Sequence, residues 1–494
     1  MSNRSIFIKN FSANLLLQIT TVVSGFVLPP LIILHYGSTV NGMLVSVKQL
    51  IAYLDILEAG IGASSIALLY KPLFEKNAAR RNQILAATHR FYRLIGLIFF
   101  VLLIILAVGY SYLIRQQIPY TTTFMVILLL GMVNVLDFLT IATYRILLQA
   151  DHKTAVLSYT QTGITLLNVL VCWQLIVHDT GNTGLIDLQI AFFLVSLIRF
   201  VLISAYTHKK YPDLSLKPIS RISLRDIPQK RDVFIYKAVA LINYVIPLII
   251  ISIFCGLKDA SIYAVYWLIF NAIKLLLHSL SNGMGSIFGH TLADSEQNKN
   301  TTTIFNRYEN LYFTIVSFLY TCVLILALPF ISIYTQDMVD ANYYQPILIW
   351  LFVLYGLTDL RIPSDLLCNA SANFKILRQR AFIELIINLP LSLVLVHYIG
   401  FYGVLVAGIC TFFYSTIKII SYTDRHLLNR RKTISLKKII IVIIPLIIVF
   451  QLQNSNLLTL KMDSYVSWLI TSTLVSSLCA ISSFAIYKVL IKIN

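Results

Sequence analysis

The sequence has few charged residues. Only 12% of its 494 residues are Asp, Glu, Lys or Arg, whereas 58% are hydrophobic, and the mean hydropathy is +0.79. A soluble chain of this length would divide into several domains with separate cores. Here apolar segments follow one another along the whole length, joined by short polar connections. This composition excludes an independent soluble domain and predicts an all-α polytopic membrane protein, because it is that of a chain whose main solvent is lipid.

The sequence also lacks the motifs of several kinds of functional site. The cysteines are scattered singly, without the close spacing that a metal or dithiol site needs. Lys274 and His278 share a helix face but offer no second metal ligand, so we expect no zinc site. There is no Gly-rich phosphate loop ending in Lys-Ser/Thr, which argues against ATP hydrolysis by this chain. The amino terminus lacks a small-residue cleavage site, so the first apolar stretch is expected to be a retained span. We therefore expect no cofactor and no metal.

Crossing a hydrocarbon core takes roughly 17 to 25 apolar residues, and on that basis the sequence predicts about fourteen transmembrane helices. The first six are separated from the next six by a long basic connection, and a final pair follows. The predicted spans are 11–34, 43–69, 94–114, 122–148, 156–177, 188–206, 234–255, 262–288, 311–334, 345–370, 381–397, 404–422, 439–450 and 466–491.

Lys and Arg are distributed very unevenly between the two sets of loops. One set holds nearly all of them, including the 208–233 connection, the 425–438 cluster and an amphipathic loop at 71–93; the other holds only Arg115, Lys258 and Lys461. The positive-inside rule then predicts that both termini are cytoplasmic. We attribute the net charge of +18 to this bias and to anionic membrane lipids as partners, and expect no nucleic acid to bind.

An internal repeat is indicated by four pairs of positions that recur in one order about 220 residues apart. The pairs are Gly60 and Gly283, Asp137 and Asp359, Leu147 and Leu366, and Asn168 and Asn388. An even number of spans separates the halves, so the repeat is parallel, with two pseudo-symmetric six-helix bundles and a pseudo-twofold axis along the membrane normal. We expect bundles at 1–207 and 234–423, a cytoplasmic linker at 208–233, and a basic loop with a C-terminal helix pair at 424–494.

Charges inside the spans are the candidate functional residues, because each would cost about 3 kcal/mol or more if it faced lipid. Cations in such a cavity suit an anionic substrate, for example phosphate or pyrophosphate on a lipid carrier, or an acidic sugar. Acids suit coupling to protons or sodium. Packing is the competing explanation: Arg361 can pair with Asp365 at i+4, and Lys48 and Asp55 can pair with neighbouring helices. Side chains near helix ends are explained by snorkelling; these are Arg145, Lys237, Glu384 and Lys418.

Several local patterns carry a resemblance to a known family. They are the Asn10-Phe-Ser-Ala-Asn14 start, the Leu28-Pro-Pro-Leu31 kink, the Tyr36-Gly37 and Asn41-Gly42 turn, and the Asp55-x-x-Glu58-x-Gly60-Ile-Gly62 run. They resemble bacterial polysaccharide flippases, the O-antigen (Wzx-type) branch of the multidrug/oligosaccharidyl-lipid/polysaccharide (MOP) exporter superfamily.

This resemblance implies a non-enzymatic secondary transporter in the bacterial cytoplasmic membrane. It would move an undecaprenyl-pyrophosphate-linked oligosaccharide from the inner to the outer leaflet by alternating access, driven by a proton or sodium gradient. The polysaccharide polymerase and glycosyltransferases of the pathway would be partners. The sequence departs from the family by lacking a rich cluster of arginines in its first bundle.

We assign substrate binding to the cations that match the family's cationic cavity and ion coupling to the acids. The substrate-binding candidates are Lys48, Lys274, Arg361 and Arg199, and the ion-coupling candidates are Asp55, Glu58, Asp137 and Asp359. Three alternatives remain: a cation-coupled multidrug antiporter of the same superfamily, a membrane polysaccharide polymerase or ligase, and a non-transporting scaffold. The short outer loops count against the enzyme, and the buried cations count against the antiporter.

Overall fold

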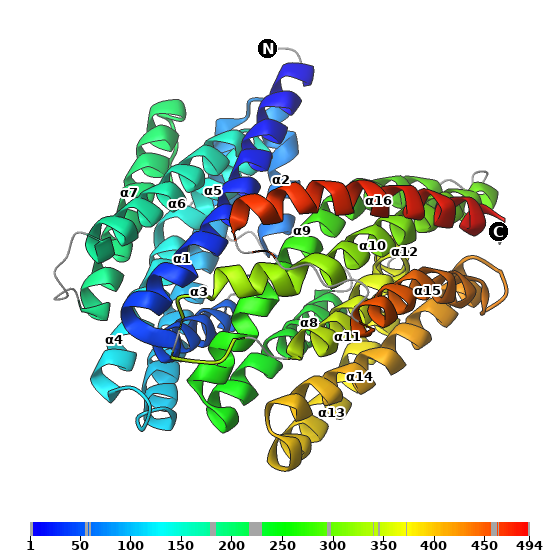
Figure 1. Ribbon diagram of the computed structural model, residues 1–494. Helices are drawn as coiled ribbons and strands as arrows, with labels where there is room; N and C mark the ends of the chain where they lie inside the picture. The colour runs from blue at the N-terminus through cyan, green and yellow to red at the C-terminus, as the bar shows by residue number, and fades with distance from the viewer. Residues whose placement is uncertain are drawn as a thin grey trace. The chain divides into compact units, whose positions relative to one another are not determined.

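The computed structural model shows a chain whose secondary structure, over the residues described, is entirely helical (Figure 1). The described residues are 3–54, 58, 61–177, 184–216, 230–293, 298–338, 340–343, 346–371, 373–455, 462 and 464–492. Asp55, Gly60, residues 217–229 of the predicted linker and the side chain of Lys237 lie outside them. The chain forms two compact units, Met1–Leu241 and Ile242–Asn494, and the division falls within one helix.

Unit 1 contains the helices from the amino terminus to the start of α8. Within it α1 packs along α6, α6 along α7, α3 along α4, and the short α2 against α3 and α5 (Figure 1). Its elements are α1 (Asn3–Leu54), α2 (Ile61–Phe74), α3 (Ala78–Leu113), α4 (Tyr120–Leu136), the π-helical turn η2 (Asp137–Ile141), α5 (Ala142–Ala150), α6 (Thr154–Val177), α7 (Leu185–Lys210) and the beginning of α8 (Lys230–Ile250).

Unit 2 contains the rest of α8 and the helices that follow. Here α13 packs along α14, α11 along α14, and α10 against both α15 and α16, so the final helix pair lies on α10. Its further elements are the π-helical turn η4 (Ile251–Cys255), α9 (Leu257–Ala293), α10 (Asn298–Tyr334), α11 (Ile347–Leu360), α12 (Ile362–Ala370), α13 (Phe374–Ile399), α14 (Phe401–Tyr422), the π-helical turn η5 (Thr423–Leu427), α15 (Ile434–Asn454) and α16 (Tyr465–Ile491).

The predicted membrane-spanning helices are confirmed. The described residues contain 12 helices long and apolar enough to cross a membrane, together with the shorter apolar helix Ile242–Cys255. The first of them is broken at Gly37, whose φ of 85° is left-handed backbone that glycine adopts without strain. The number of long helices is lower than the predicted fourteen because two predicted spans begin within α1 and because the described part of the predicted span 234–255 is this shorter helix. The prediction of an amphipathic loop at 71–93 was wrong, because most of this segment is helical and α3 already begins at Ala78.

Two spans are interrupted next to an acidic residue. The α4–α5 span changes to a π-helical turn at Asp137, and the α11–α12 span breaks at Arg361, two residues after Asp359 and two before Pro363. Proline removes a backbone donor and disrupts the preceding turn, and π-turns are frequent at functional sites in helices. These interruptions therefore direct attention to the charged side chains beside them.

Candidate functional site

Four charged side chains from different parts of unit 1 meet in one cluster, which we call the Arg145 cluster. Arg145 on α5 donates to Glu58 Oε1 over 2.6 Å and to Asp137 Oδ2 over 2.9 Å. The Tyr92 hydroxyl on α3 donates to Glu58 Oε1 over 2.8 Å. Arg199 on α7 is the fourth member, with Nη2 3.7 Å from Asp137 Oδ1. The two acids and two bases balance, so the cluster carries no net charge when all are ionised.

The two arginines of the Arg145 cluster differ in how many hydrogen bonds they make. Arg145 engages both carboxylates, whereas Arg199 Nε and Asp137 Oδ1 are buried without a hydrogen-bond partner among the described residues. The 3.7 Å between Arg199 and Asp137 is too long for a hydrogen bond. A buried polar atom without a partner costs free energy. Arg199 is therefore the member of the cluster with unused donor capacity.

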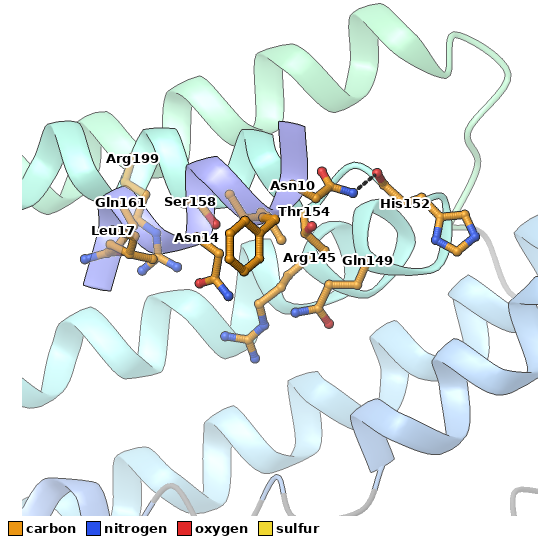
Figure 2. Close-up of a pocket in the computed structure, with 12 residues that line it drawn as sticks. Asn10, Asn14, Leu17, Arg145, Gln149, His152, Thr154, Ser158, Gln161 and Arg199 are labelled. Carbon is orange, nitrogen blue, oxygen red and sulfur yellow. Dashed lines mark hydrogen bonds between the residues drawn. The ribbon is translucent and has the colours of Figure 1, made fainter. Parts of the chain in front are cut away.

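A pocket of about 750 Å³ opens beside these two arginines. Figure 2 shows that it is built by residues from α1, the α5–α6 turn and its flanking helices, and α7. Apart from the arginines its polar lining is neutral, made of amides and hydroxyls together with His152. The lining residues are Asn10, Phe11, Asn14, Leu17, Arg145, Gln149, His152, Thr154, Leu157, Ser158, Gln161 and Arg199.

Asn10 fixes one wall of this pocket. Its side-chain amide donates to the His152 carbonyl over 2.8 Å (Figure 2), and its Oδ1 accepts from the Ala155 backbone N–H at 3.0 Å. The latter is one of the N–H groups at the start of α6 that have no partner within the helix. Asn10 thus ties α1 to the α5–α6 turn, where His152 takes a left-handed φ of 55°.

A second polar network surrounds the far side of the same turn. Asp151 accepts from both Lys153 Nζ and the Tyr211 hydroxyl, and Lys153 Nζ also lies 2.9 Å from the Tyr211 oxygen. Arg81 stacks on the Tyr211 ring and forms an ion pair of 2.9 Å with Asp213. Burial and the adjacent Asp151 carboxylate raise the pKa of the Tyr211 hydroxyl above its usual range. This network holds the ends of α5, α6 and α7 together around the pocket.

Lys48 lies apart from the Arg145 cluster, on the second half of α1. Its side chain is exposed, it forms no ion pair with any described residue, and it lies within electrostatic range of Cys172 on α6. Asp55, which shares its helix face in the sequence prediction, is outside the described residues. Lys48 is therefore available to an anionic group.

Unit 2 holds the other two predicted substrate cations and Asp359. Lys274 on α9 lies 4.2 Å from the centre of the Tyr244 ring and within electrostatic range of Asp359. Asp359 is 2% exposed and accepts a hydrogen bond of 2.7 Å from the Tyr320 hydroxyl. It forms no ion pair with a described residue. Lys274 and Asp359 are thus charges stabilised by aromatic rings and hydroxyls instead of by close counter-ions.

Arg361, in contrast, has close acidic partners. It donates to Glu384 Oε1 over 2.6 Å and to Ser415 Oγ over 2.9 Å, and its Nε lies 3.5 Å from Asp365. Arg380 bridges Asp365 and Glu384 from the other side. These two acids and two bases form an ion-pair network that joins the α11–α12 break to α12 and α13. Such a network supports the packing explanation that the sequence left open for Arg361.

The structure corrects the snorkelling interpretation at two positions and adds a cluster that the sequence did not predict. Arg145 and Glu384 do not extend toward headgroups, because both lie in ion pairs within their unit. In unit 2, Arg430 lies 3.0 Å from Glu309 and 2.8 Å from Asp424, and Lys438 lies 2.8 Å from Glu309. The basic cluster at 425–438 is visible in the sequence. Its pairing with Glu309, more than a hundred residues away, is not.

Among the residues that the structure describes, no group of three or more His, Cys, Asp or Glu side chains is arranged to hold a metal ion. The candidate site residues carry guanidinium, ammonium, amide and hydroxyl groups, which recognise anions and sugars.

Comparisons with known proteins show similarity in structure alone. No family model matches the chain, and no curated protein matches it. The inward closed conformation of the lipid II flippase MurJ superposes with a TM-score of 0.69 at 14% identity, covering 99% of this chain and 100% of the flippase. An inward-facing multidrug resistance MATE family transporter of the MOP superfamily gives 0.60 at 14% identity, covering 83% of this chain and 98% of the transporter.

A third solved structure, a MOP superfamily transporter from Pyrococcus furiosus, gives a TM-score of 0.52 at 12% identity and covers 83% of this chain and 94% of that one. The three neighbours are one flippase and two transporters. The flippase matches this chain from end to end, whereas the MATE transporter leaves part of this chain without a counterpart. The chain therefore has the fold of MOP-superfamily exporters.

Proposed function

We propose that this protein is a secondary transporter that moves an undecaprenyl-pyrophosphate-linked oligosaccharide from the inner to the outer leaflet of a bacterial cytoplasmic membrane. The observation that carries the proposal is the presence of Lys48 and Lys274 within membrane-spanning helices without a close counter-ion among the described residues. A charge at membrane depth is retained when it serves a substrate path. Each of these cations is a candidate to bind an anionic group of a lipid-linked glycan.

The fold supports the same proposal. The match to the flippase covers 99% of this chain, and the match to the multidrug transporter covers 83% of it. The sequence resemblance is to the polysaccharide branch of the superfamily. Transporters built from repeated bundles work by alternating access, and we propose the same mechanism here. We propose both termini in the cytoplasm, an ion gradient as energy source, and the polymerase and glycosyltransferases of the pathway as partners.

The acids differ in how well they suit ion coupling. Glu58 and Asp137 already neutralise Arg145, so binding a cation there requires that ion pair to open. Asp359 is buried without an ion pair among the described residues, which makes it the stronger candidate for binding a proton or sodium ion. Asp55 keeps its proposed coupling role, and Arg361 is expected to stabilise unit 2 more than to bind substrate.

The test is flipping in proteoliposomes. The purified protein is reconstituted with a fluorescent undecaprenyl-pyrophosphate oligosaccharide, with and without an imposed proton or sodium gradient, and outer-leaflet substrate is measured by quenching. Gradient-stimulated flipping is expected, and Lys48→Ala and Lys274→Ala should each reduce it at least tenfold. Lys418→Ala is the matched control, because Lys418 is exposed on α14 beside Tyr414.

Other outcomes separate the alternatives. Efflux of organic cations without flipping of any glycan would assign the protein to multidrug antiport, and lengthening of the glycan would indicate a polymerase. If flipping is intact in both lysine variants, the substrate role of Lys48 and Lys274 is wrong even though the transport function stands.

A further inference from the structure

The pocket beside the Arg145 cluster contains hydrogen-bonding groups that the fold does not use. The side-chain amides of Asn14 on α1, Gln149 on α5 and Gln161 on α6 make no hydrogen bond with any described residue, and all three line the pocket. Each amide offers two donors and an acceptor. Three unengaged amides around one cavity form a surface suited to a ligand rich in hydroxyl groups.

The same pocket also contains unused positive charge. Arg199 lines it, and its buried Nε lacks a hydrogen-bond partner among the described residues. Its nearest acid, Asp137, is 3.7 Å away and is already bonded to Arg145 through its other oxygen. A guanidinium with free donors binds phosphate oxygens strongly and with defined geometry. An organic cation, in contrast, would meet two arginines here.

We infer that this pocket is a binding site for a glycosyl phosphate, with the phosphate on Arg199 and the sugar hydroxyls on Asn14, Gln149 and Gln161. The inference rests on the proposed function and deepens it, because it assigns the phosphorylated sugar of the substrate a subsite formed by unit 1 alone. None of the three amides was a candidate in the sequence. Ser158 and Thr154 at the start of α6 add hydroxyls to the same lining.

The size of the pocket limits what it holds. Ligand sites for small molecules are typically about 300–1,000 Å³, and this one is about 750 Å³. That is room for a phosphorylated mono- or disaccharide, not for a long glycan. The pocket therefore recognises the end of the glycan next to the phosphate and leaves the remaining sugars outside, so it would not distinguish glycans that differ only at the far end.

The experiment is binding by purified full-length protein in lipid nanodiscs. The probes are undecaprenyl-pyrophosphoryl-N-acetylglucosamine and the soluble N-acetylglucosamine 1-phosphate, with phosphatidylglycerol as competitor. Arg199→Gln is expected to weaken binding of both probes at least tenfold, and Asn14→Ala and Gln161→Ala about three- to tenfold each. Gln174→Ala, an exposed amide elsewhere on α6, is the matched control and should leave Kd unchanged. The two alanine variants keep the test informative if Arg199→Gln folds poorly.

The outcomes are distinct. Weakened binding of the lipid-linked probe alone, or of both probes, supports the site and identifies the source of the sugar phosphate. Unchanged Kd in all three pocket variants, with wild-type flipping intact, overturns the subsite and leaves the proposed function standing. Displacement of either probe by an equal concentration of phosphatidylglycerol also overturns it, because the pocket would then be a general lipid site. A wild-type protein that neither binds nor flips any glycosyl phosphate overturns both.

Discussion

At the scale of single residues, Arg145 neutralises two carboxylates of unit 1. It is 23% exposed and pairs with Glu58 and Asp137, which are 30% and 12% exposed. Desolvating a charge is costly, and a buried pair compensates that cost only while both partners are present. Removing Arg145 would leave two carboxylates facing each other with only Arg199 nearby.

We therefore expect Arg145→Met to destabilise the protein by about 3 kcal/mol, seen as a lower midpoint of thermal unfolding in detergent. Adding Glu58→Gln and Asp137→Asn should restore part of the loss, because the unpaired charges are then removed. If the triple variant is no more stable than Arg145→Met, the loss arises from packing and the electrostatic explanation is wrong.

The sequence predicted which residue types matter here better than it predicted their arrangement. Glu58, Asp137 and Arg199 were all candidates, because a charge within an apolar run is visible without a structure. Their assembly around Arg145 was not, since the Glu58–Arg145 pair joins positions 87 residues apart. Asn14 appeared only within a pattern that carries the family resemblance, and Gln149 and Gln161 gave no signal, because neutral amides are common and only the pocket distinguishes these.

At the scale of helices, close backbone approaches decide which neighbours can pack. The α13–α14 turn contains Gly400, with a left-handed φ of 57°. A side-chain carbon added at Gly403 would lie 2.3 Å from the Leu395 carbonyl oxygen. That oxygen belongs to backbone and cannot rotate away, so the hairpin depends on glycine at this position.

Gly403→Ala is accordingly expected to cost about 1–3 kcal/mol through overpacking. Gly163→Ala on α6 is the control, because nothing lies within 4 Å of the carbon it would add. Thermal unfolding of the two variants in the same detergent makes the comparison. Equal unfolding midpoints for the two variants would show that the α13–α14 hairpin accommodates the added carbon without losing stability.

The ion pairs of Arg430, Glu309, Asp424 and Lys438 join α10 to η5 and α15. Lys438 on α15 is 0% exposed and is paired with Glu309 on α10, while Arg430 connects Glu309 to Asp424 on η5. Each of these charges is acceptable in the interior only because the others are present.

Glu309→Gln should thus lower stability by about 3 kcal/mol, since Lys438 would lose its counter-ion. The double variant Glu309→Gln with Lys438→Met should recover part of it. Unfolding midpoints of the single and double variants provide the measurement, and Lys418→Met, at an exposed lysine, serves as the reference for loss of charge alone. A double variant as unstable as the single one would exclude the ion pair as the cause.

At the scale of the whole molecule, hydropathy predicted the fold well because lipid imposes one rule on every span: backbone groups must be bonded within the helix. The predicted apolar runs therefore correspond to helices, 12 of which are long and apolar enough to cross a membrane among the described residues. Helix extensions into polar sequence, such as the first turns of α3 from Ala78, were missed because hydropathy detects only the part in lipid. Sidedness and the repeat remain predictions.

Sidedness has a direct test. Arg115 and Lys432 are both exposed and lie on opposite sides in the predicted topology. In intact spheroplasts a membrane-impermeant maleimide should label Arg115→Cys, whereas Lys432→Cys should be labelled only after permeabilisation. The unaltered protein, which has six cysteines of its own, measures the background. Reversed labelling would invert the proposed orientation and with it the direction of flipping.

The two partners of the Glu58–Arg145 pair are synthesised at different times. The two residues are 87 positions apart, and a ribosome adding roughly 5–20 residues per second needs on the order of 4–17 s to cover that distance. During that interval Glu58 has been synthesised but Arg145 has not. The nascent chain must remain sheltered by the insertion machinery until α5 is made, so slowing translation between these two positions would expose the unfinished protein to quality-control proteases.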